Sequence, residues 1–283
     1  MSLPDLLIEP VVRAALAEDL GRAGDVTAAA CVPEGARLSA VFAARQDGRV
    51  AGLACTRLAI HALDPAARFT AELADGDDAP VGAILARVEA DARALLSAER
   101  TALNLLGRLC GIATLTRTYV RAVEGTGVRI ADTRKTTPGL RALEKHAVKC
   151  GGGVNHRFGL DDAILIKDNH VAACGGSVGE ALRRARAHVG HLMKIEVEVD
   201  RLEQLQEALE HDPDVVMLDN FSLEDLRTAV ALVDRCVVLE ASGGVNLQTV
   251  RAIAETGVDV ISVGALTHSA PVLDLSLILE TVQ

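Results

Sequence analysis

The sequence lacks tryptophan, has a single tyrosine and contains only 2% aromatic residues, so aliphatic side chains must build its core. Without aromatic platforms on which bases could stack, nucleic acid is a disfavoured ligand. The net charge of −10 also disfavours binding to nucleic acid or to an anionic membrane surface. No apolar run is long enough to span a membrane. We therefore expect neither nucleic acid nor membrane among the partners of this protein.

The six cysteines include no Cys-x-x-Cys pair, and the opening residues, MSLPDLLIEP, lack the basic region of a secretory signal. This usage favours reduced, buried thiols over a disulfide or metal role. We expect a cytoplasmic protein.

The first third of the chain mixes short strands with helices. We expect an antiparallel sheet with helices, an α+β arrangement, because the strand patterns alternate and turn signals separate them. The expected elements are helices at 5–18 and 56–63, a turn at 24–27, a hairpin of strands 38–45 and 49–55 around 46–48, and strands at 68–73 and 84–89. A helix then begins near Ala94, is expected to break at Gly111, and resumes over 112–124.

From residue 128 onward, short apolar strands alternate with amphipathic helices, which favours a parallel sheet or barrel of the α/β class. Ser177 with Glu180, and Ser222 ahead of two acidic residues, are typical helix starts. Strands are expected at 128–131, 163–167, 193–199, 214–218, 236–240 and 258–263, and helices at 139–149, 177–189, 201–211, 222–234 and 246–256.

Polar residues follow nearly every one of these strands. In βα barrels the active site lies at the carboxyl ends of the strands, so these residues should converge. The stretch 132–170 is cationic within an acidic protein, which predicts a small anionic ligand carrying several carboxylates or phosphates. The strand-end residues are Asp132 to Lys135, Lys167 to His170, Glu196 and Glu198, Asp219 and Asn220, Glu240 with Ser242 to Gly244, and Gly264.

Residue chemistry suggests roles within this group. Arg134 suits bidentate binding of a carboxylate, whereas Lys135 suits a phosphate as a point charge. Glu198, with Asp219 after the next strand, could hold Mg²⁺ or sugar hydroxyls, the alternative being an internal salt-bridge network with Lys194. The loop Ser242-Gly243-Gly244 could bind phosphate through backbone N–H groups.

Six motifs together resemble the quinolinate phosphoribosyltransferase family. They are Thr-Arg-Lys-Thr-Thr-Pro-Gly at 133–139, Asn-His-Arg at 155–157, Ile-Lys-Asp-Asn-His at 166–170, Glu-Val-Glu-Val at 196–199, Leu-Asp-Asn at 218–220 and Glu-Ala-Ser-Gly-Gly at 240–244. The resemblance covers essentially the whole chain. It implies a type II phosphoribosyltransferase fold: an N-terminal α/β sandwich domain (1–110), an incomplete, TIM-like α/β barrel (111–269), and a C-terminal tail (270–283) that packs back on the first domain.

The resemblance also implies a reaction: quinolinate and 5-phosphoribosyl diphosphate give nicotinate mononucleotide, diphosphate and CO₂, with Mg²⁺, in NAD biosynthesis. It implies a homodimer whose active sites are shared, with Arg100 reaching the site of the other subunit. Quinolinate would be bound by Arg100, Thr133, Arg134, His156, Arg157 and Lys167. The phosphoribosyl diphosphate would be bound by Lys135, Lys167, Glu198, Asp219, Ser242, Gly243, Gly244 and Gly264, with Mg²⁺ on Glu198 and Asp219, in part through water. Glu198 is preferred to Glu196 because its 21-residue separation from Asp219 matches the family.

Two other functions remain open. A relative recruited to molybdenum transport operons would share the fold but lose part of the cation set, and Lys167 speaks against it. A non-catalytic anion-binding module would avoid carboxylates such as Glu198 and Asp219 at its site.

Overall fold

The computed structural model describes residues 3–280 and divides them into two compact units. The first unit contains the chain up to residue 117, residues 136–152 and the chain from 266 on, whereas the second contains 118–135 and 153–265. Within the described range, no helix combines the length and the apolarity needed to cross a membrane.

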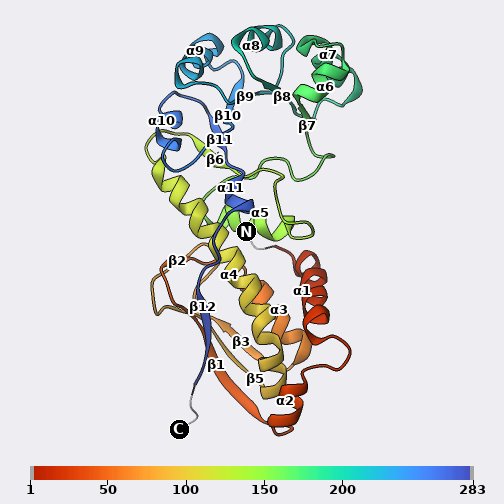
Figure 1. Ribbon diagram of the computed structural model, residues 1–283, viewed down its shortest axis with the longest axis vertical. Helices are drawn as coiled ribbons and strands as arrows, with labels where there is room; N and C mark the ends of the chain where they lie inside the picture. The colour runs from red at the N-terminus through yellow and green to blue at the C-terminus, as the bar shows by residue number, and fades with distance from the viewer. Residues whose placement is uncertain (1–2, 281–283) are drawn as a thin grey trace. The chain divides into compact units, whose positions relative to one another are not determined.

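The first unit is built on a four-stranded antiparallel sheet in the order β12-β1-β5-β3. Its strands are β1 (Arg37–Ala44), β3 (Arg68–Ala71), β5 (Ile84–Asp91) and β12 (Leu275–Leu279), so β12, the last strand in the chain order, lies beside β1, one of the first (Figure 1). A separate two-stranded ladder joins β2 (Gly48–Arg49) to β4 (Asp78–Ala79). The helices are α1 (Asp5–Leu20), α2 (Val26–Cys31), α3 (Leu53–Leu63), most of α4 (Ala92–Ala122), α5 (Arg141–Cys150) and most of the short α11 (Ala265–His268). The last residues of α4, from 118 on, and the first residue of α11 belong to the second unit.

Two local predictions for this unit are wrong. The hairpin around 46–48 does not form, because β1 pairs with β5 and β12 while β2 pairs with β4. Residues 49–55 do not form one strand either: Gly52 adopts φ 98°, which favours glycine, and α3 begins at the next residue. Only the first half of the expected turn at 24–27 precedes α2, since Val26 and Thr27 already belong to that helix. Asp25 Oδ1 accepts a hydrogen bond from Ala28 N at 2.8 Å and caps the helix.

Gly111 does not break the long helix, contrary to expectation. Helix α4 runs without interruption from Ala92 to Ala122. A Cβ atom on Gly111 would lie 1.9 Å from the carbonyl oxygen of Pro271, far inside van der Waals contact. Gly111 therefore serves close packing of the 271 segment against the helix, and tertiary packing outweighs its low helix propensity.

The second unit is a six-stranded parallel sheet in the order β6-β11-β10-β9-β8-β7. Strands β6 and β7 are its two edges, as in an incomplete barrel, and the α/β class expected from the sequence is confirmed. Its apolar interior includes Ile195, Val197, Val216, Leu218 and Ile261, each fully buried. The strands are β6 (Arg129–Ala131), β7 (Ile164–Ile166), β8 (Ile195–Val199), β9 (Val215–Asp219), β10 (Val238–Ser242) and β11 (Val260–Ser262).

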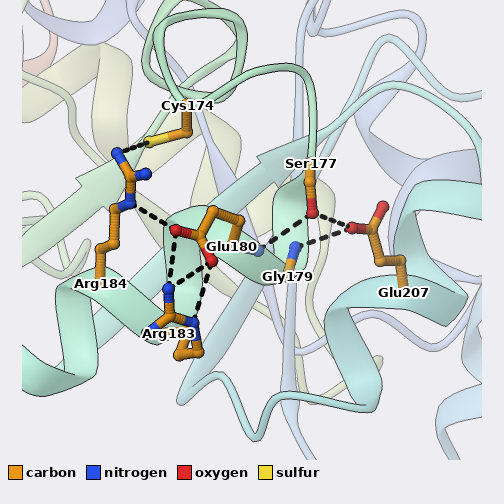
Figure 2. Close-up of polar contacts among 7 residues, drawn as sticks. All are labelled: Cys174, Ser177, Gly179, Glu180, Arg183, Arg184 and Glu207. Carbon is orange, nitrogen blue, oxygen red and sulfur yellow. Dashed lines mark hydrogen bonds and ion pairs between the residues drawn. The ribbon is translucent and has the colours of Figure 1, made fainter.

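Helices α7 (Val178–His188), α8 (Leu202–Leu209) and α9 (Leu223–Val233) pack side by side along this sheet (Figure 1). The unit also contains α6 (Asp168–Ala173) and α10 (Val250–Ala254). Ser177 caps α7 as predicted, since its Oγ accepts from Glu180 N at 3.0 Å. The Glu180 side chain pairs with Arg183 and Arg184 instead of completing a capping box, and Glu207 binds Ser177 Oγ and Gly179 N (Figure 2).

All six cysteines are free thiols. The expected burial is correct for Cys55, Cys110 and Cys150, but it is wrong for Cys31 and Cys236, which are exposed.

Candidate active site

A cavity of about 530 Å³ opens at the carboxyl ends of the parallel strands in the second unit. Every residue that lines it belongs to that unit, and most are polar or charged. The lining residues are Thr133, Arg134, Lys135, His156, Arg157, Leu165, Lys167, Glu198, Met217, Asp219, Asn220, Glu240, Ser242, Gly243 and Ser262.

Two guanidinium groups on neighbouring loops bring positive charge to this cavity. The buried Nε atoms of Arg134 and Arg157 have no hydrogen-bond partner, although Arg157 Nη1 donates to Ala163 O at 3.1 Å. Burial lowers the pKa of Arg157, and the charge of nearby Arg134 lowers it further. Two close cations with unused donors are unfavourable alone, so an anion that accepts from both would be stabilised.

Two carboxylates lie at the ends of adjacent strands on another side of the cavity. Glu198, on β8, forms an ion pair with Lys167 Nζ, just beyond β7. Asp219 ends β9, and its Oδ2 accepts from Asn220 Nδ2 at 2.8 Å. Lys194 Nζ lies 2.7 Å from Asp214. Lys194 therefore forms its salt bridge with Asp214 instead of the predicted alternative, an internal network with Glu196 and Glu198.

His156 lines the cavity and contacts acidic side chains through both its backbone N–H and its imidazole Nε2. The fully buried Asp132 accepts from His156 N at 2.9 Å and from Asn155 Nδ2 at 2.6 Å, which sets the backbone of the Asn-His-Arg motif. His156 Nε2 lies 2.9 Å from Glu196 and 3.7 Å from Glu240. Burial and the charge of Glu196 raise the pKa of Glu240 above its ordinary value.

The loop after β10 brings its backbone close to the cavity. Gly243 and Gly244 adopt φ 87° and 60°, in the region that favours glycine. A Cβ atom on Gly243 would lie 2.2 Å from Asn220 Oδ1, so no larger residue fits without movement of the neighbouring loop. Asn220 itself has φ 57°, and its N donates to Ser242 O at 2.9 Å, which ties the loops after β9 and β10 together.

The structure brings ten of the thirteen sequence-predicted site residues to this one cavity: Thr133, Arg134, Lys135, His156, Arg157, Lys167, Glu198, Asp219, Ser242 and Gly243. Gly244 and Gly264 are outside its lining, and Arg100 is exposed on α4 in the first unit.

Five lining residues were not assigned as ligand contacts, although Asn220 and Glu240 were among the strand-end residues expected to converge. Leu165, Met217, Glu240 and Ser262 each stand two residues before a predicted one, at Lys167, Asp219, Ser242 and Gly264. Alternate residues of a strand face the same side, so this period of two could have identified them. Asn220, the fifth, directly follows Asp219.

Two family signatures match the chain. Residues 25–110 match the quinolinate phosphoribosyl transferase N-terminal domain, and residues 112–278 match the C-terminal domain of the same family.

Individual relatives agree with these matches. The chain is 47% identical over 271 residues to the nicotinate-nucleotide pyrophosphorylase [carboxylating] of Mycobacterium leprae, covering 94% of this chain and 95% of the relative. It is 46% identical over 260 residues to the probable enzyme of the same name in Bacillus subtilis, covering 92% and 89%. The solved nicotinate-nucleotide pyrophosphorylase of Francisella tularensis superposes with a TM-score of 0.92 at 38% identity, covering 99% and 98%. The chain therefore belongs to the quinolinate phosphoribosyl transferase family.

Proposed function

We propose that this protein is a carboxylating nicotinate-nucleotide pyrophosphorylase of NAD biosynthesis. It transfers the phosphoribosyl group of 5-phosphoribosyl diphosphate to quinolinate and releases diphosphate and CO₂. The observation that carries the proposal is the pair Arg134 and Arg157, whose buried Nε donors lack partners at the cavity. Quinolinate is a dianion, and its two adjacent carboxylates are the kind of acceptor that such a pair requires.

The substrate would bind with its carboxylates toward Arg134, His156 and Arg157. Thr133 and Lys167 line the same cavity and complete the proposed quinolinate contacts within this unit. Arg100, exposed on α4, would be supplied by the other subunit of a homodimer, and this assembly is part of the proposal.

In the transfer step the pyridine nitrogen attacks the anomeric carbon of the ribose while the bond from that carbon to the diphosphate oxygen breaks. Positive charge develops on the sugar, and the carboxylates of Glu198 and Asp219, which line the cavity, would stabilise it. Lys135 and Lys167 would neutralise the leaving diphosphate. The ion pair of Lys167 with Glu198 offsets the repulsion that this carboxylate would exert on an anionic substrate.

The loop of Ser242, Gly243 and Gly244, with Gly264, would hold the 5-phosphate through backbone N–H groups. Decarboxylation then breaks the bond between the ring carbon next to nitrogen and its carboxylate. The pyridinium nitrogen stabilises the electron pair left on that carbon, which takes a proton from water. No dedicated base is required for this step.

The donor chemistry at the cavity fits the expected Mg²⁺. Glu198 and Asp219 offer carboxylate oxygens on adjacent strands, and both are only partly buried, so they can be reached from the cavity. Mg²⁺ prefers oxygen ligands and retains several waters, as such a two-carboxylate site would allow. When bound, the ion would offset the charge of the diphosphate.

A cytoplasmic location is also proposed.

The test is release of CO₂ from carboxyl-labelled quinolinate, with and without phosphoribosyl diphosphate and Mg²⁺. Quinolinate should be preferred over nicotinate by more than about a thousandfold in kcat/KM, because nicotinate leaves buried cations unpaired. Arg157→Ala should lose activity, whereas the matched control Arg183→Ala, an exposed arginine on α7, should not. Comparable turnover of nicotinate would refute the assignment, and binding without CO₂ release would indicate an anion-binding module.

A further inference from the structure

Three potential metal ligands lie close together in the first unit. None of the three residues lines the candidate active-site cavity of the second unit, which is called the barrel cavity below. His146 Nε2 lies 2.8 Å from Asp75 Oδ2 and 3.4 Å from Cys150 Sγ. His146 and Cys150 are four residues apart on α5, so the helix presents both on one face toward the loop that carries Asp75. The three donor atoms all lie within 4.8 Å of one another.

His146 Nε2 has more close partners than a single hydrogen bond would need. An imidazole nitrogen has a single N–H bond or a single lone pair, so one well-placed partner satisfies it. Here a carboxylate oxygen and a thiol sulfur both approach the same nitrogen, Nε2 of His146. Convergence of oxygen, nitrogen and sulfur donors on a common point is the arrangement of ligands around a metal ion.

The carboxylate of this group is held in position by the backbone. Asp75 Oδ1 accepts from Gly52 N at 3.0 Å and from Leu53 N at 3.2 Å, which leaves Oδ2 directed at His146. Burial would raise the pKa of Asp75, but the hydrogen bonds from His146 and from these two N–H groups outweigh it and lower the pKa. Asp75 is therefore an ionised ligand with a fixed orientation, as metal-binding carboxylates usually are.

A cavity of about 860 Å³ gives access to the group and is lined by all three residues. It leaves room for a water or small ligand beside them. Arg49 and Lys149 also line it and would repel a cation, but Arg49 is paired with Asp78 at 3.0 Å and donates to Cys150 O at 3.0 Å.

We propose that Asp75, His146 and Cys150 form a site for one Zn²⁺ ion, with the fourth coordination position open to this cavity. Bond lengths of about 2.0–2.1 Å to nitrogen and oxygen and about 2.3 Å to sulfur, in a tetrahedron, place the nitrogen about 3.5 Å from the sulfur and about 3.3 Å from the oxygen. The observed nitrogen–sulfur distance of 3.4 Å matches, and the nitrogen–oxygen distance of 2.8 Å must lengthen by about half an ångström. A mixed sulfur, nitrogen and oxygen set selects Zn²⁺ over Mg²⁺.

Binding must release the thiol proton. Burial raises the pKa of Cys150 to about 12, and the charge of Asp75 contributes to the rise. Zn²⁺ binds the thiolate form of cysteine, so this proton is lost when the metal binds.

The test uses the full chain, stripped with a chelator and titrated with Zn²⁺ against a chromophoric competitor. Wild type should bind one high-affinity equivalent, and Cys150→Ser, His146→Ala and Asp75→Asn should each weaken binding by at least about 100-fold. Cys236→Ser and His188→Ala are matched controls outside the cluster and should bind as wild type does. Co²⁺ in place of Zn²⁺ should show thiolate-to-metal absorption that Cys150→Ser abolishes.

Circular dichroism establishes that each variant is folded, and the isosteric Cys150→Ser keeps the test valid if His146→Ala fails to fold. Zn²⁺ should raise the Tm of wild type but not of Cys150→Ser. His156→Ala distinguishes this site from the group of His156, Glu196 and Glu240 in the second unit. The proposal is refuted if wild type binds no stoichiometric Zn²⁺, or if His156→Ala abolishes binding that Cys150→Ser retains.

Discussion

Replacement of Glu144 should destabilise the first unit strongly, although this residue does not line the barrel cavity. Glu144 is fully buried on α5 and accepts four hydrogen bonds. Arg108 donates from Nε at 3.2 Å and from Nη2 at 2.9 Å, while Thr137 donates from its backbone N at 3.0 Å and its hydroxyl at 2.8 Å. The carboxylate thus ties α4, through Arg108, to the end of the 133–139 motif.

The expected loss of unfolding free energy depends on which hydrogen-bond partners Arg108 keeps after Glu144 is replaced. Removing one partner of a buried ion pair costs about 3–5 kcal/mol, because it leaves an uncompensated charge. Arg108 would keep the carbonyl groups of Ala270 and Thr267, and glutamine would keep the volume and one acceptor oxygen. We therefore expect about 3 kcal/mol for Glu144→Gln. At about 2–4 °C per kcal/mol, the Tm should fall by about 6–12 °C.

The assay is thermal unfolding followed by circular dichroism, with Glu180→Gln as a matched control. Glu180 also pairs with two arginines, Arg183 and Arg184, but at the surface (Figure 2). Exposed ion pairs contribute less than about 1 kcal/mol, so this control should shift the Tm only slightly.

A double-mutant cycle with Arg108→Met isolates the interaction between Arg108 and Glu144. The double variant should be less destabilised than the sum of the two single variants. Additive effects, or a shift for Glu144→Gln no larger than for Glu180→Gln, would refute the reasoning.

Three further predictions follow from particular contacts. Gly111→Ala should cost about 1–3 kcal/mol of unfolding free energy, because its Cβ would lie 1.9 Å from Pro271 O, whereas Gly190→Ala, with open space, should be nearly neutral by urea denaturation. Isothermal titration should show that Lys135→Ala chiefly impairs phosphoribosyl diphosphate binding, while Arg157→Ala weakens quinolinate binding by about 2–5 kcal/mol; reversed effects would mean that the two subsites are exchanged. If Arg100 acts across a dimer, refolding an equal mixture of Arg100→Ala and Lys135→Ala chains should restore roughly a quarter of wild-type activity, and inactive mixed dimers would contradict this assignment.

The barrel unit was the more predictable part of the protein. Each of its strands begins and ends within about two residues of its expected position. Because parallel strands share the direction of their carboxyl ends, the polar residues after each strand could be assigned to one site from order along the chain alone. Arg134, Lys167 and Asp219 were identified in this way and line the same cavity. Strand order gave both Glu196 and Glu198, and the family resemblance selected Glu198, which lines the cavity.

The first unit was less predictable, because its decisive contacts join residues far apart in the chain. β1 pairs with β12 and β5 instead of forming the hairpin that its local turn signal favours. Gly111 stays helical because it packs on Pro271, and no local pattern contains that contact.

The sequence by itself determined the periodicity of the elements, the helix starts at Ser177 and Ser222, and the charged motifs, because these depend on neighbours within one or two turns of chain. Only the tertiary structure decided how charges and ligands pair. It joined Lys194 to Asp214, His156 to Glu196, and Asp75 to His146 and Cys150. Such pairings depend on distances of a few ångströms between side chains on different elements, and packing of the whole unit sets those distances.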